Sequence, residues 1–584
     1  MFYWNKNKYR NKINKQEFIV HLNEFDNIEE YLFVVKYAEV FTGNLATNDT
    51  KNSVQQLLFE KFYSKFPDKV NRFLNDILIL NDLYKKLSES REAELSKVRQ
   101  ELLPLYLINS LNFVIETTQT KITAEASDHR DFWIDFVGKQ LKILLRNKVE
   151  FKYIAVRDTV PDSLLRIFLD HHIFSSTIVD SWVYSELLIS QSDGKLCFKE
   201  IGQFSIEKLY TQAIFLELKE SRDFHGSLIH TFSDEEDKDF EHRKEYTYKQ
   251  IEEYFYTDDF NQEYLGVSLN EWIMGYLTLY KISLMYSEPT LLTENILLSM
   301  YKANLIREES AKIILKNLSF SVSSRDLYDS PLIKFGHEFL LLPKFIESID
   351  FSRSIFSLLS NVQNDFDTQI SQKGKNFERH INSLVKYQFD ICSSGLKVVE
   401  GQETYEIDGL FFDGGTVVVL ESKTQKQPEN YIDYAKNQLE LKSYIQKFHR
   451  NADFFINNKD YIIKELKLDS NQEFTFIKVF VTNVSQMKYE IDGVYIIDEI
   501  DFSNFMRRRV PGLNIFSNFY KTQKCIELEP ELYSGKATVQ QFVDLIKNSK
   551  KRYRIQEKIK TRKLDFMGHQ NIEIFVLDDF IKVN

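Results

Sequence analysis

The sequence predicts a multidomain α+β protein, in which a large and mainly helical N-terminal region precedes an α/β domain with a mixed central sheet. Three observations lead to this prediction. The chain has 584 residues, which is more than one ordinary hydrophobic core accommodates. Apolar residues recur at helical spacing through residues 1–350, and short strand-like runs between helices follow from Gln372 onward. With only 18 Gly and 9 Pro, the sequence offers little material for long flexible linkers.

We therefore expect three parts. Residues 1–350 form a helical recognition or regulatory region of one or two subdomains, residues 351–505 form the α/β domain, and residues 506–584 form a basic C-terminal segment. The clearest helical patterns of the first part are Leu102–Val114, Leu269–Tyr286 and Ile296–Leu315. Its end contains the turn signal Asp329-Ser330-Pro331 and a short expected strand, Glu338–Leu342.

Composition narrows the class of protein. A net charge of −11 excludes a protein whose whole surface binds polyanions, but it allows a local basic groove. The sequence has no run of eighteen apolar residues, and the opening residues 1–16 lack the apolar core of an export signal. The three cysteines lie far apart and match neither a zinc site nor a disulfide framework. We expect a cytoplasmic protein that does not contact membranes.

The α/β domain is expected to follow the order αβββαβ(β). Its helices are predicted at Gly374–Phe389 and Glu429–Arg450. Its strands are predicted at Leu396–Glu400, Thr404–Asp413, Thr416–Lys423, Phe474–Thr482 and Gly493–Asp498. This order is typical of a mixed sheet covered by helices on both faces.

A tight hairpin brings two carboxylates together. A two-residue turn at Gly414-Gly415 is favoured because both positions can adopt positive φ, and it pairs Asp413 with Thr416. In that register Asp408 lies directly opposite Glu421 on one face. A turn at Asp413-Gly414 would instead make Glu421 the diagonal neighbour of Asp408, still on the same face. Lys423 follows Glu421 by two residues and shares its face.

This group of charges suggests a metal site. Two carboxylates and an ammonium at the end of a buried strand pair are costly unless something compensates for them, and carboxylate oxygens suit Mg²⁺ or Mn²⁺. The plainer alternative is a salt bridge between Lys423 and an acid at the end of the strand. Two helical residues extend the candidate site. Glu378 borders the apolar stripe of its helix, and it is either a metal ligand or an acid at the helix edge. Gln438 interrupts the apolar stripe of the next helix, and it either contacts water or phosphate or caps a backbone group.

A hairpin with Asp408 and then Glu421-x-Lys423 follows a helix that carries Glu378. This arrangement resembles the PD-(D/E)xK nuclease superfamily and is closest to its Mrr-like and RecB-like branches. The resemblance covers residues 370–505 and implies a restriction-endonuclease-like fold. It implies that Asp408, Glu421 and Glu378 bind Mg²⁺ or Mn²⁺, that Lys423 orients or activates the attacking water, and that Gln438 is the polar residue of the following helix. The chain departs from the family pattern in two ways. No proline precedes Asp408, and the Gln-x-x-x-Tyr of RecB-type exonucleases is absent, which argues against processive exonuclease action.

The resemblance implies a nuclease, with DNA as the expected substrate and restriction or antiviral defence in bacteria as the expected role. Two alternatives stay open at this point: a ribonuclease, because a metal site sees only phosphate, and a non-catalytic module that binds nucleic acid or protein on a nuclease-like fold. We also expect the helical N-terminal region to bind a protein partner or a second copy of the chain.

Basic residues concentrate near the C-terminus. Residues 547–563 hold nine Lys or Arg and one acid, and a second group directly follows the last expected strand. The candidate phosphate contacts are Arg507, Arg508, Arg509, Lys550, Lys551, Arg552 and Arg554. The alternative is that these residues form a solvated helix face.

Overall fold

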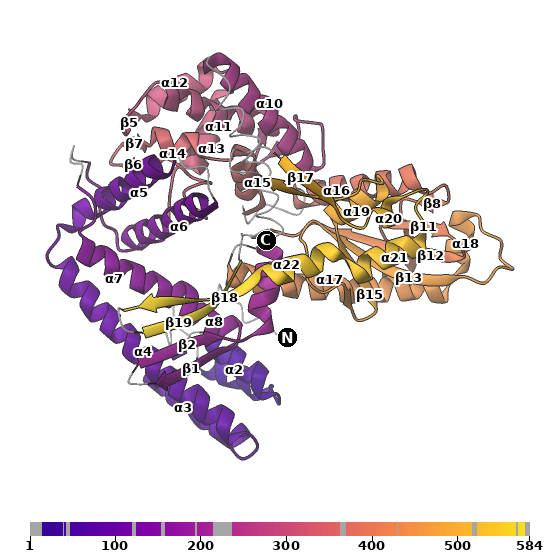
Figure 1. Cartoon of the computed structure of the whole chain (residues 1–584), viewed down its shortest axis with the longest axis horizontal. Helices are drawn as coiled ribbons and strands as arrows, with labels where there is room; N and C mark the ends of the chain where they lie inside the picture. The colour runs from indigo at the N-terminus through magenta and orange to yellow at the C-terminus, as the bar shows by residue number, and fades with distance from the viewer. Residues whose placement is uncertain are drawn as a thin grey trace.

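The computed structural model describes residues 15–38, 40–41, 47–119, 124–153, 158–192, 195–213, 236–361, 369–428, 430–516, 522–567 and 570–577. The first fourteen residues, where we expected no export signal, lie outside this range. The described chain mixes helices with several sheets, as predicted for an α+β protein (Figure 1). None of the helices in these segments is long and apolar enough to cross a membrane.

One hydrophobic core lies at the start of the chain. Helix α7 (Asp162–Ile173) contacts it through Ile173 but buries Leu164 and Phe168 in the second core. The other helices of this first core are α1 (Lys15–Asn23), α2 (Ile28–Tyr37), α3 (Asn48–Leu58), α4 (Pro67–Leu95) and α8 (Asp180–Tyr184). They pack against the hairpin of β1 (Leu187–Ser192) and β2 (Lys195–Glu200). The C-terminal hairpin, β18 (Ile559–Phe566) and β19 (Gln570–Leu577), completes this sheet in the order β1-β2-β19-β18. Strand β19 pairs in parallel with β2, so strands that are far apart in the sequence share one sheet.

A second, larger core follows. Its helices are α5 (Leu103–Gln119), α6 (Ala124–Arg146), α10 (Glu236–Phe255), α11 (Leu269–Leu284), α12 (Glu294–Ala303), α13 (Glu308–Leu318), α14 (Pro343–Glu347) and α15 (Phe351–Asn361). Its strands are β3 (Glu263–Tyr264), β4 (Val267–Ser268), β5 (Thr290–Thr293), β6 (Ile333–Phe335) and β7 (Glu338–Leu341). The expected strand at Glu338–Leu342 is therefore present. The pattern at Ile296–Leu315 belongs to two helices, because Leu305 adopts a positive φ of 63° between them.

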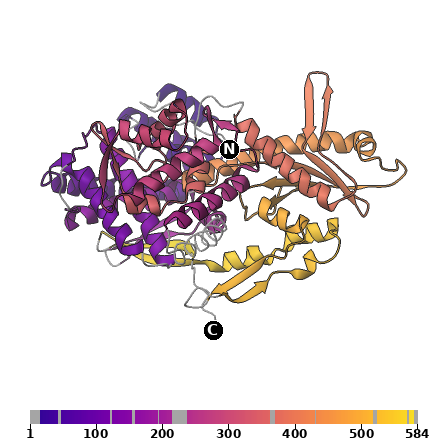
Figure 2. The same cartoon turned by 90° about the horizontal axis from the view of Figure 1, so that it is seen from above.

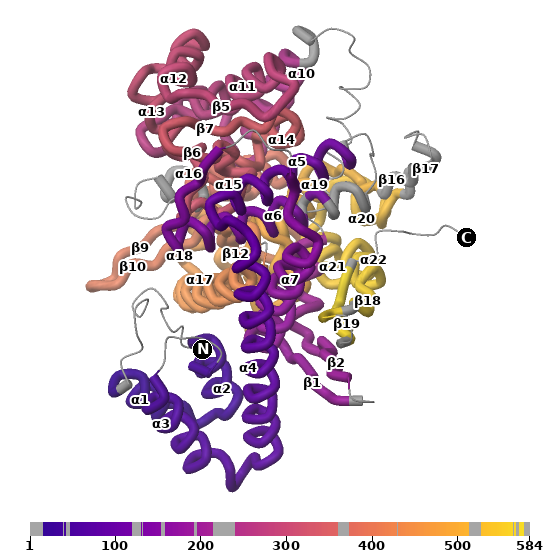
Figure 3. Tube along the Cα trace, turned by 90° about the vertical axis from the view of Figure 1, so that its left-hand side faces the viewer, coloured from indigo at the N-terminus to yellow at the C-terminus, as the bar shows by residue number. Residues whose placement is uncertain are grey.

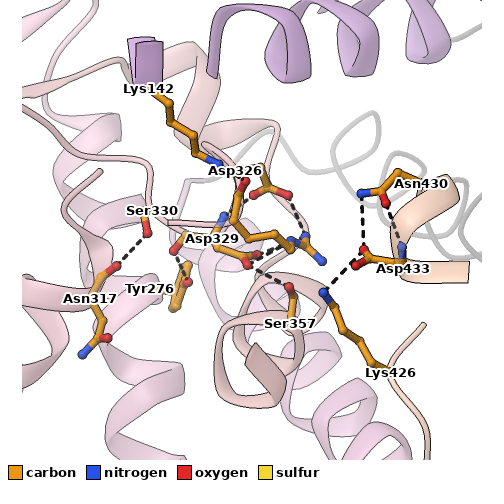
Figure 4. A network of polar contacts seen from close by, with 11 residues as sticks. Lys142, Tyr276, Asn317, Asp326, Asp329, Ser330, Ser357, Lys426, Asn430 and Asp433 are labelled. Carbon is orange, nitrogen blue, oxygen red and sulfur yellow. Dashed lines mark hydrogen bonds and ion pairs between the residues drawn. The ribbon is translucent and has the colours of Figure 1, made fainter. Parts of the chain in front are cut away.

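Helix α15 packs into this second core, although we had assigned residues from 351 onward to the α/β domain. Ile355 and Leu358 are among the buried residues of the core. A buried polar network fixes the same helix (Figure 4). Ser357 of α15 donates to the Asp329 carboxylate (2.7 Å), and the Tyr276 hydroxyl donates to the Asp329 carbonyl (2.8 Å). The turn predicted around Asp329 thus anchors α15 to the helical region.

The α/β domain contains a six-stranded mixed sheet with the order β14-β15-β13-β12-β11-β8. Its strands are β8 (Cys392–Ser393), β11 (Gly409–Asp413), β12 (Thr416–Lys423), β13 (Thr475–Thr482), β14 (Glu490–Ile491) and β15 (Val494–Asp498). Strands β12, β13 and β15 are parallel, and the other pairings are antiparallel. The expected strand Thr404–Asp413 is broken at Asp408, because β10 (Glu403–Ile407) pairs with β9 (Leu396–Glu400) in a separate hairpin that projects from the body (Figure 3).

Helices cover both faces of this sheet. One face packs on α16 (Gln369–Gln388), α19 (Glu499–Met506) and α21 (Val539–Asn548). The other packs on α17 (Tyr431–Asn457) and α18 (Asp460–Leu466). The remaining C-terminal elements are β16 (Gly512–Phe516), β17 (Thr522–Glu527), α20 (Pro530–Tyr533) and α22 (Lys550–Lys558). Residues 506–584, expected as one basic segment, thus divide between the α/β domain and the first core. Figure 2 shows the C-terminal elements on the side of the domain opposite the β9–β10 hairpin.

Candidate active site

The hairpin has the register that the glycine pair favours. Gly414 and Gly415 have φ values of 56° and 82°, and Asp413 pairs with Thr416. Pairing continues to Gly409 and Leu420, and the Asp408 N–H donates to the Leu420 carbonyl (3.0 Å). Asp408 therefore lies opposite Glu421 at the end of the paired region, as predicted.

Lys423 bridges the two carboxylates. Its Nζ lies 3.1 Å from Asp408 Oδ2 and 2.8 Å from Glu421 Oε1. The same Oδ2 also accepts the Ser422 N–H (2.9 Å) and the Ser422 hydroxyl (3.2 Å). Asp408 and Glu421 are buried, with 8% and 6% of their surfaces exposed, whereas the side chain of Lys423 is 34% exposed. The cluster is thus a buried pair of acids with a lysine that reaches solvent.

Burial and mutual repulsion change the acidity of these groups. Burial raises the pKa of Glu421 to about 7, the Asp408 carboxylate adds to the rise, and Lys423 offsets only part of it. Burial alone would lower the pKa of Lys423, but the two carboxylates raise it above its usual value. Lys423 consequently stays protonated at neutral pH, while Glu421 is near its titration midpoint.

Helix α16 brings Glu378 close to this cluster. The Asn382 side chain donates to the Asp408 carbonyl (2.9 Å), so this face of α16 touches the hairpin. Glu378 lies one helical turn earlier on the same face. Burial raises the pKa of Glu378, and Asp408 raises it further, as expected for an acid that faces the site. In the described segments, however, no three His, Cys, Asp or Glu side chains are close enough together to hold a metal ion. The structure thus joins Asp408 with Glu421 and leaves Glu378 beside them.

Gln438 points into a different network. Its amide donates to Gln486 Oε1 (2.7 Å), and the Gln486 amide in turn donates to Asn437 Oδ1 (3.3 Å). Gln425 joins the same network through the Asn437 carbonyl (3.1 Å) and the Thr482 hydroxyl (3.2 Å). Gln438 is half-buried, and its partner is the Gln486 side chain rather than the backbone group of the structural interpretation.

Two residues of α17 that the sequence patterns did not single out lie within electrostatic range of the cluster. Lys447 lowers the pKa of Glu421, and Lys423 partly offsets the rise that burial causes in the pKa of Tyr444. Leu441 and Ile445 of the same helix are buried against the sheet. Tyr444 directly precedes Ile445, so it borders the buried stripe. That position was the available signal, but it is common to the edge of any amphipathic helix.

The predicted phosphate contacts divide into exposed and structural residues. Arg507, Arg509 and Lys550 are exposed, and Arg552 and Arg554 are half-buried. Arg508 instead donates to the carbonyls of Leu532 (2.8 Å) and Ser534 (2.9 Å), and thereby fixes α20. Lys551 pairs with Asp501 (2.8 Å) and lies 3.9 Å from Asp498, with 17% of its side chain exposed. Arg508 and Lys551 are thus engaged by the fold.

Comparison with known proteins returns no matching family model, no matching curated protein and no matching solved structure. The geometry of Asp408, Glu421 and Lys423 is therefore the basis for assigning a function.

Proposed function

We propose that this chain is a metal-dependent nuclease, with a restriction-endonuclease-like domain of the PD-(D/E)xK superfamily centred on Asp408, Glu421 and Lys423. One observation carries the proposal. Two buried carboxylates face each other across a hairpin, and a lysine two residues beyond the second acid contacts both. Glu421 and Lys423 lie near the carboxyl end of β12, the edge at which open α/β sheets bind their ligands.

The donor set fits Mg²⁺ or Mn²⁺. Hard divalent cations prefer carboxylate oxygens, and the pKa of Glu421 is raised first by burial and then by repulsion from Asp408, which a cation would relieve. Asp408 and Glu421 would hold the ion, with Glu378 beside it. When bound, such an ion supplies positive charge that polarises a phosphate and makes water more acidic.

Lys423 has a separate task. Its ammonium is held by two acids, remains protonated and is partly open to solvent. It can therefore donate a hydrogen bond to the attacking water or to the negative charge that develops on the phosphate. The exposed Lys447 and the half-buried Tyr444 lie within electrostatic range of the cluster and would contact the flanking phosphates. The proposed reaction is hydrolysis of a phosphodiester bond.

We propose DNA as the substrate and defence against foreign DNA as the setting, with the helical N-terminal region binding a partner or a second copy of the chain. Cleavage of plasmid, linear duplex, single-stranded DNA and RNA, with Mg²⁺, Mn²⁺ or EDTA, tests the proposal. We expect DNA cleavage that requires metal and is lost in Lys423→Ala. Cleavage of RNA alone would identify a ribonuclease. Cleavage that persists in EDTA or in Lys423→Ala would refute the proposed site.

A further inference from the structure

The carboxyl edge of the sheet links the candidate site to the C-terminal basic helix. In the parallel strands, Lys423 pairs with Thr482, and Thr482 pairs with Asp498. Neighbouring strands lie about 4.8 Å apart, so the backbone of Asp498 is about 10 Å from that of Lys423. Asp498 and Asp501 hold Lys551, the second residue of α22. Helix α22 therefore begins beside the candidate site.

From there, α22 and β18 form one continuous path across the molecule (Figure 1). Ile555 anchors the inner side of α22 against Tyr210 and Ala213 of the helical residues 203–213. Strand β18 pairs along its whole length with β19 and has no other neighbour among the strands described. The path thus runs from the α/β domain to the sheet of the first core, and its outer edge is open.

Exposed cations lie along this path. On α22, Lys550 and Arg554 share one face because they are four residues apart, and the side chain of Lys550 is 61% exposed. On β18, Lys560, Arg562 and Lys563 are exposed, the first two on one face of this edge strand and Lys563 on the other. We call these five residues the basic ridge. In a chain with a net charge of −11, such a run of like charges along one path favours a polyanion.

The ridge favours a double helix over a single strand. Single-stranded nucleic acids bind through aromatic platforms on which bases stack, and the exposed aromatic residue of α22 is Tyr553 alone. Spaced cations without such a platform match the phosphates of a duplex. At about 1.5 Å per residue in α22 and about 3.3 Å in β18, the ridge from Lys550 to Lys563 is about 29 Å long. That length corresponds to about 8 base pairs at about 3.4 Å each.

We infer that the basic ridge binds the backbone of duplex DNA over about 8 base pairs on one side of the candidate site. The inference rests on the proposed function for the position of the cut, whereas the binding itself does not require cleavage. It makes the first core a second attachment point for substrate, because β18 belongs to that sheet.

Binding of the full-length chain to labelled duplexes of about 6, 12 and 24 base pairs, in EDTA and at several salt concentrations, tests this inference. The test variant is Lys560→Gln/Arg562→Gln/Lys563→Gln. The matched control is Lys302→Gln/Lys316→Gln/Lys334→Gln, which removes three exposed charges from the second core. We expect affinity to rise up to about 8 base pairs and to level off in longer duplexes, and the salt slope of the test variant to fall by about 2.7, or about 0.9 per lost contact. The control should match wild type.

An unchanged salt slope in the test variant, tighter binding of single strands, or no duplex binding by wild type would overturn the inference. If the test variant does not fold, as judged by circular dichroism, Lys550→Gln/Arg554→Gln replaces it, with an expected fall of about 1.8 in slope. Duplex binding that depends on the ridge without any metal-dependent cleavage would refute the proposed function alone. Metal-dependent cleavage with an unchanged slope would refute the ridge alone.

Discussion

Two clusters that each hold two acids and a lysine lie at the carboxyl edge of the central sheet: Asp408, Glu421 and Lys423, and two strands away Asp498, Asp501 and Lys551. In the second cluster, Asp498 accepts the Asp501 N–H (2.9 Å) as the cap of α19 and also the Ser485 hydroxyl (2.8 Å). In the first, Glu421 has Lys423 as its hydrogen-bonding partner among the residues described.

The surroundings of the two lysines also differ. The side chain of Lys551 is 17% exposed and that of Lys423 is 34% exposed. The acids of the Asp498, Asp501 and Lys551 cluster therefore cap a helix and hold α22 in place. The Asp408, Glu421 and Lys423 cluster instead has an acid with few partners beside an accessible ammonium. Two acids and a lysine therefore do not define a reactive site by themselves. What distinguishes such a site is an acid that the fold leaves available.

The largest difference is expected in cleavage. Lys423→Ala should reduce the rate at least about 100-fold, because it removes a hydrogen-bond donor to charge that develops in the transition state. Lys551→Ala should retain cleavage per folded molecule, because Lys551 lies outside the reacting group. Single-turnover rates, corrected for the folded fraction, measure both. Equal losses in the two variants would show that the two clusters do not differ in function.

Stability should show the reverse order. Lys551→Ala leaves two buried carboxylates without their cation and should lower the free energy of unfolding by about 3 kcal/mol. Lys423→Ala should cost less, because Lys423 is more exposed and Glu421 can take up a proton. Urea denaturation measures both, and Lys550→Ala on the exposed face of α22 is the control, with a change within about 0.5 kcal/mol. A larger loss for Lys423→Ala than for Lys551→Ala would contradict this assignment.

The pH dependence of stability isolates Glu421. Its pKa is raised to about 7 in the folded chain, so the folded state binds the proton more tightly than the unfolded state. The stability associated with this group is fully present below the unfolded pKa of about 4.5 and is lost as pH rises through about 7, at about 3 kcal/mol in total. Without metal, unfolding curves of wild type and Glu421→Gln should therefore diverge over this interval, and saturating Mg²⁺ should reduce the loss in wild type. Parallel pH profiles would argue against the raised pKa.

The smallest effects concern the helical residues. Glu378→Gln should lower cleavage about tenfold, because this acid borders the cluster without joining it. Gln438→Ala should leave cleavage within about twofold and lower stability by about 1 kcal/mol, because its amide bonds to Gln486. Rates and melting curves of the two variants separate these effects. A larger rate loss in Gln438→Ala would show that Gln438 belongs to the candidate site.

Local features were readable from the sequence. The Gly414-Gly415 turn fixes the hairpin register, and the register fixes the Asp408–Glu421 pair, because each step depends on residues close in the chain. Strands β9, β12 and β15 were predicted to within one residue for the same reason. The break at Asp408 was not predicted, because it depends on β10 leaving the sheet to pair with β9 alone.

Long-range features escaped sequence analysis. The parallel pairing of β2 with β19 joins residues that are far apart in the sequence, and no local pattern encodes it. Lys551 and Arg508 look like solvent-facing cations in the sequence, yet one pairs with Asp501 and the other binds carbonyls of α20 and the residues after it. Gln438 similarly acquires its partner from the loop after β13. In each case the partner, rather than the residue itself, decides the role.

Mn²⁺ binding followed by electron paramagnetic resonance tests most directly whether the two clusters differ as proposed. Wild type and Asp501→Asn should bind Mn²⁺ with the same stoichiometry, and Glu421→Gln should lose that binding. Retained binding in Glu421→Gln, or binding lost only in Asp501→Asn, would contradict the assignment of Asp408, Glu421 and Lys423 as the metal-dependent site.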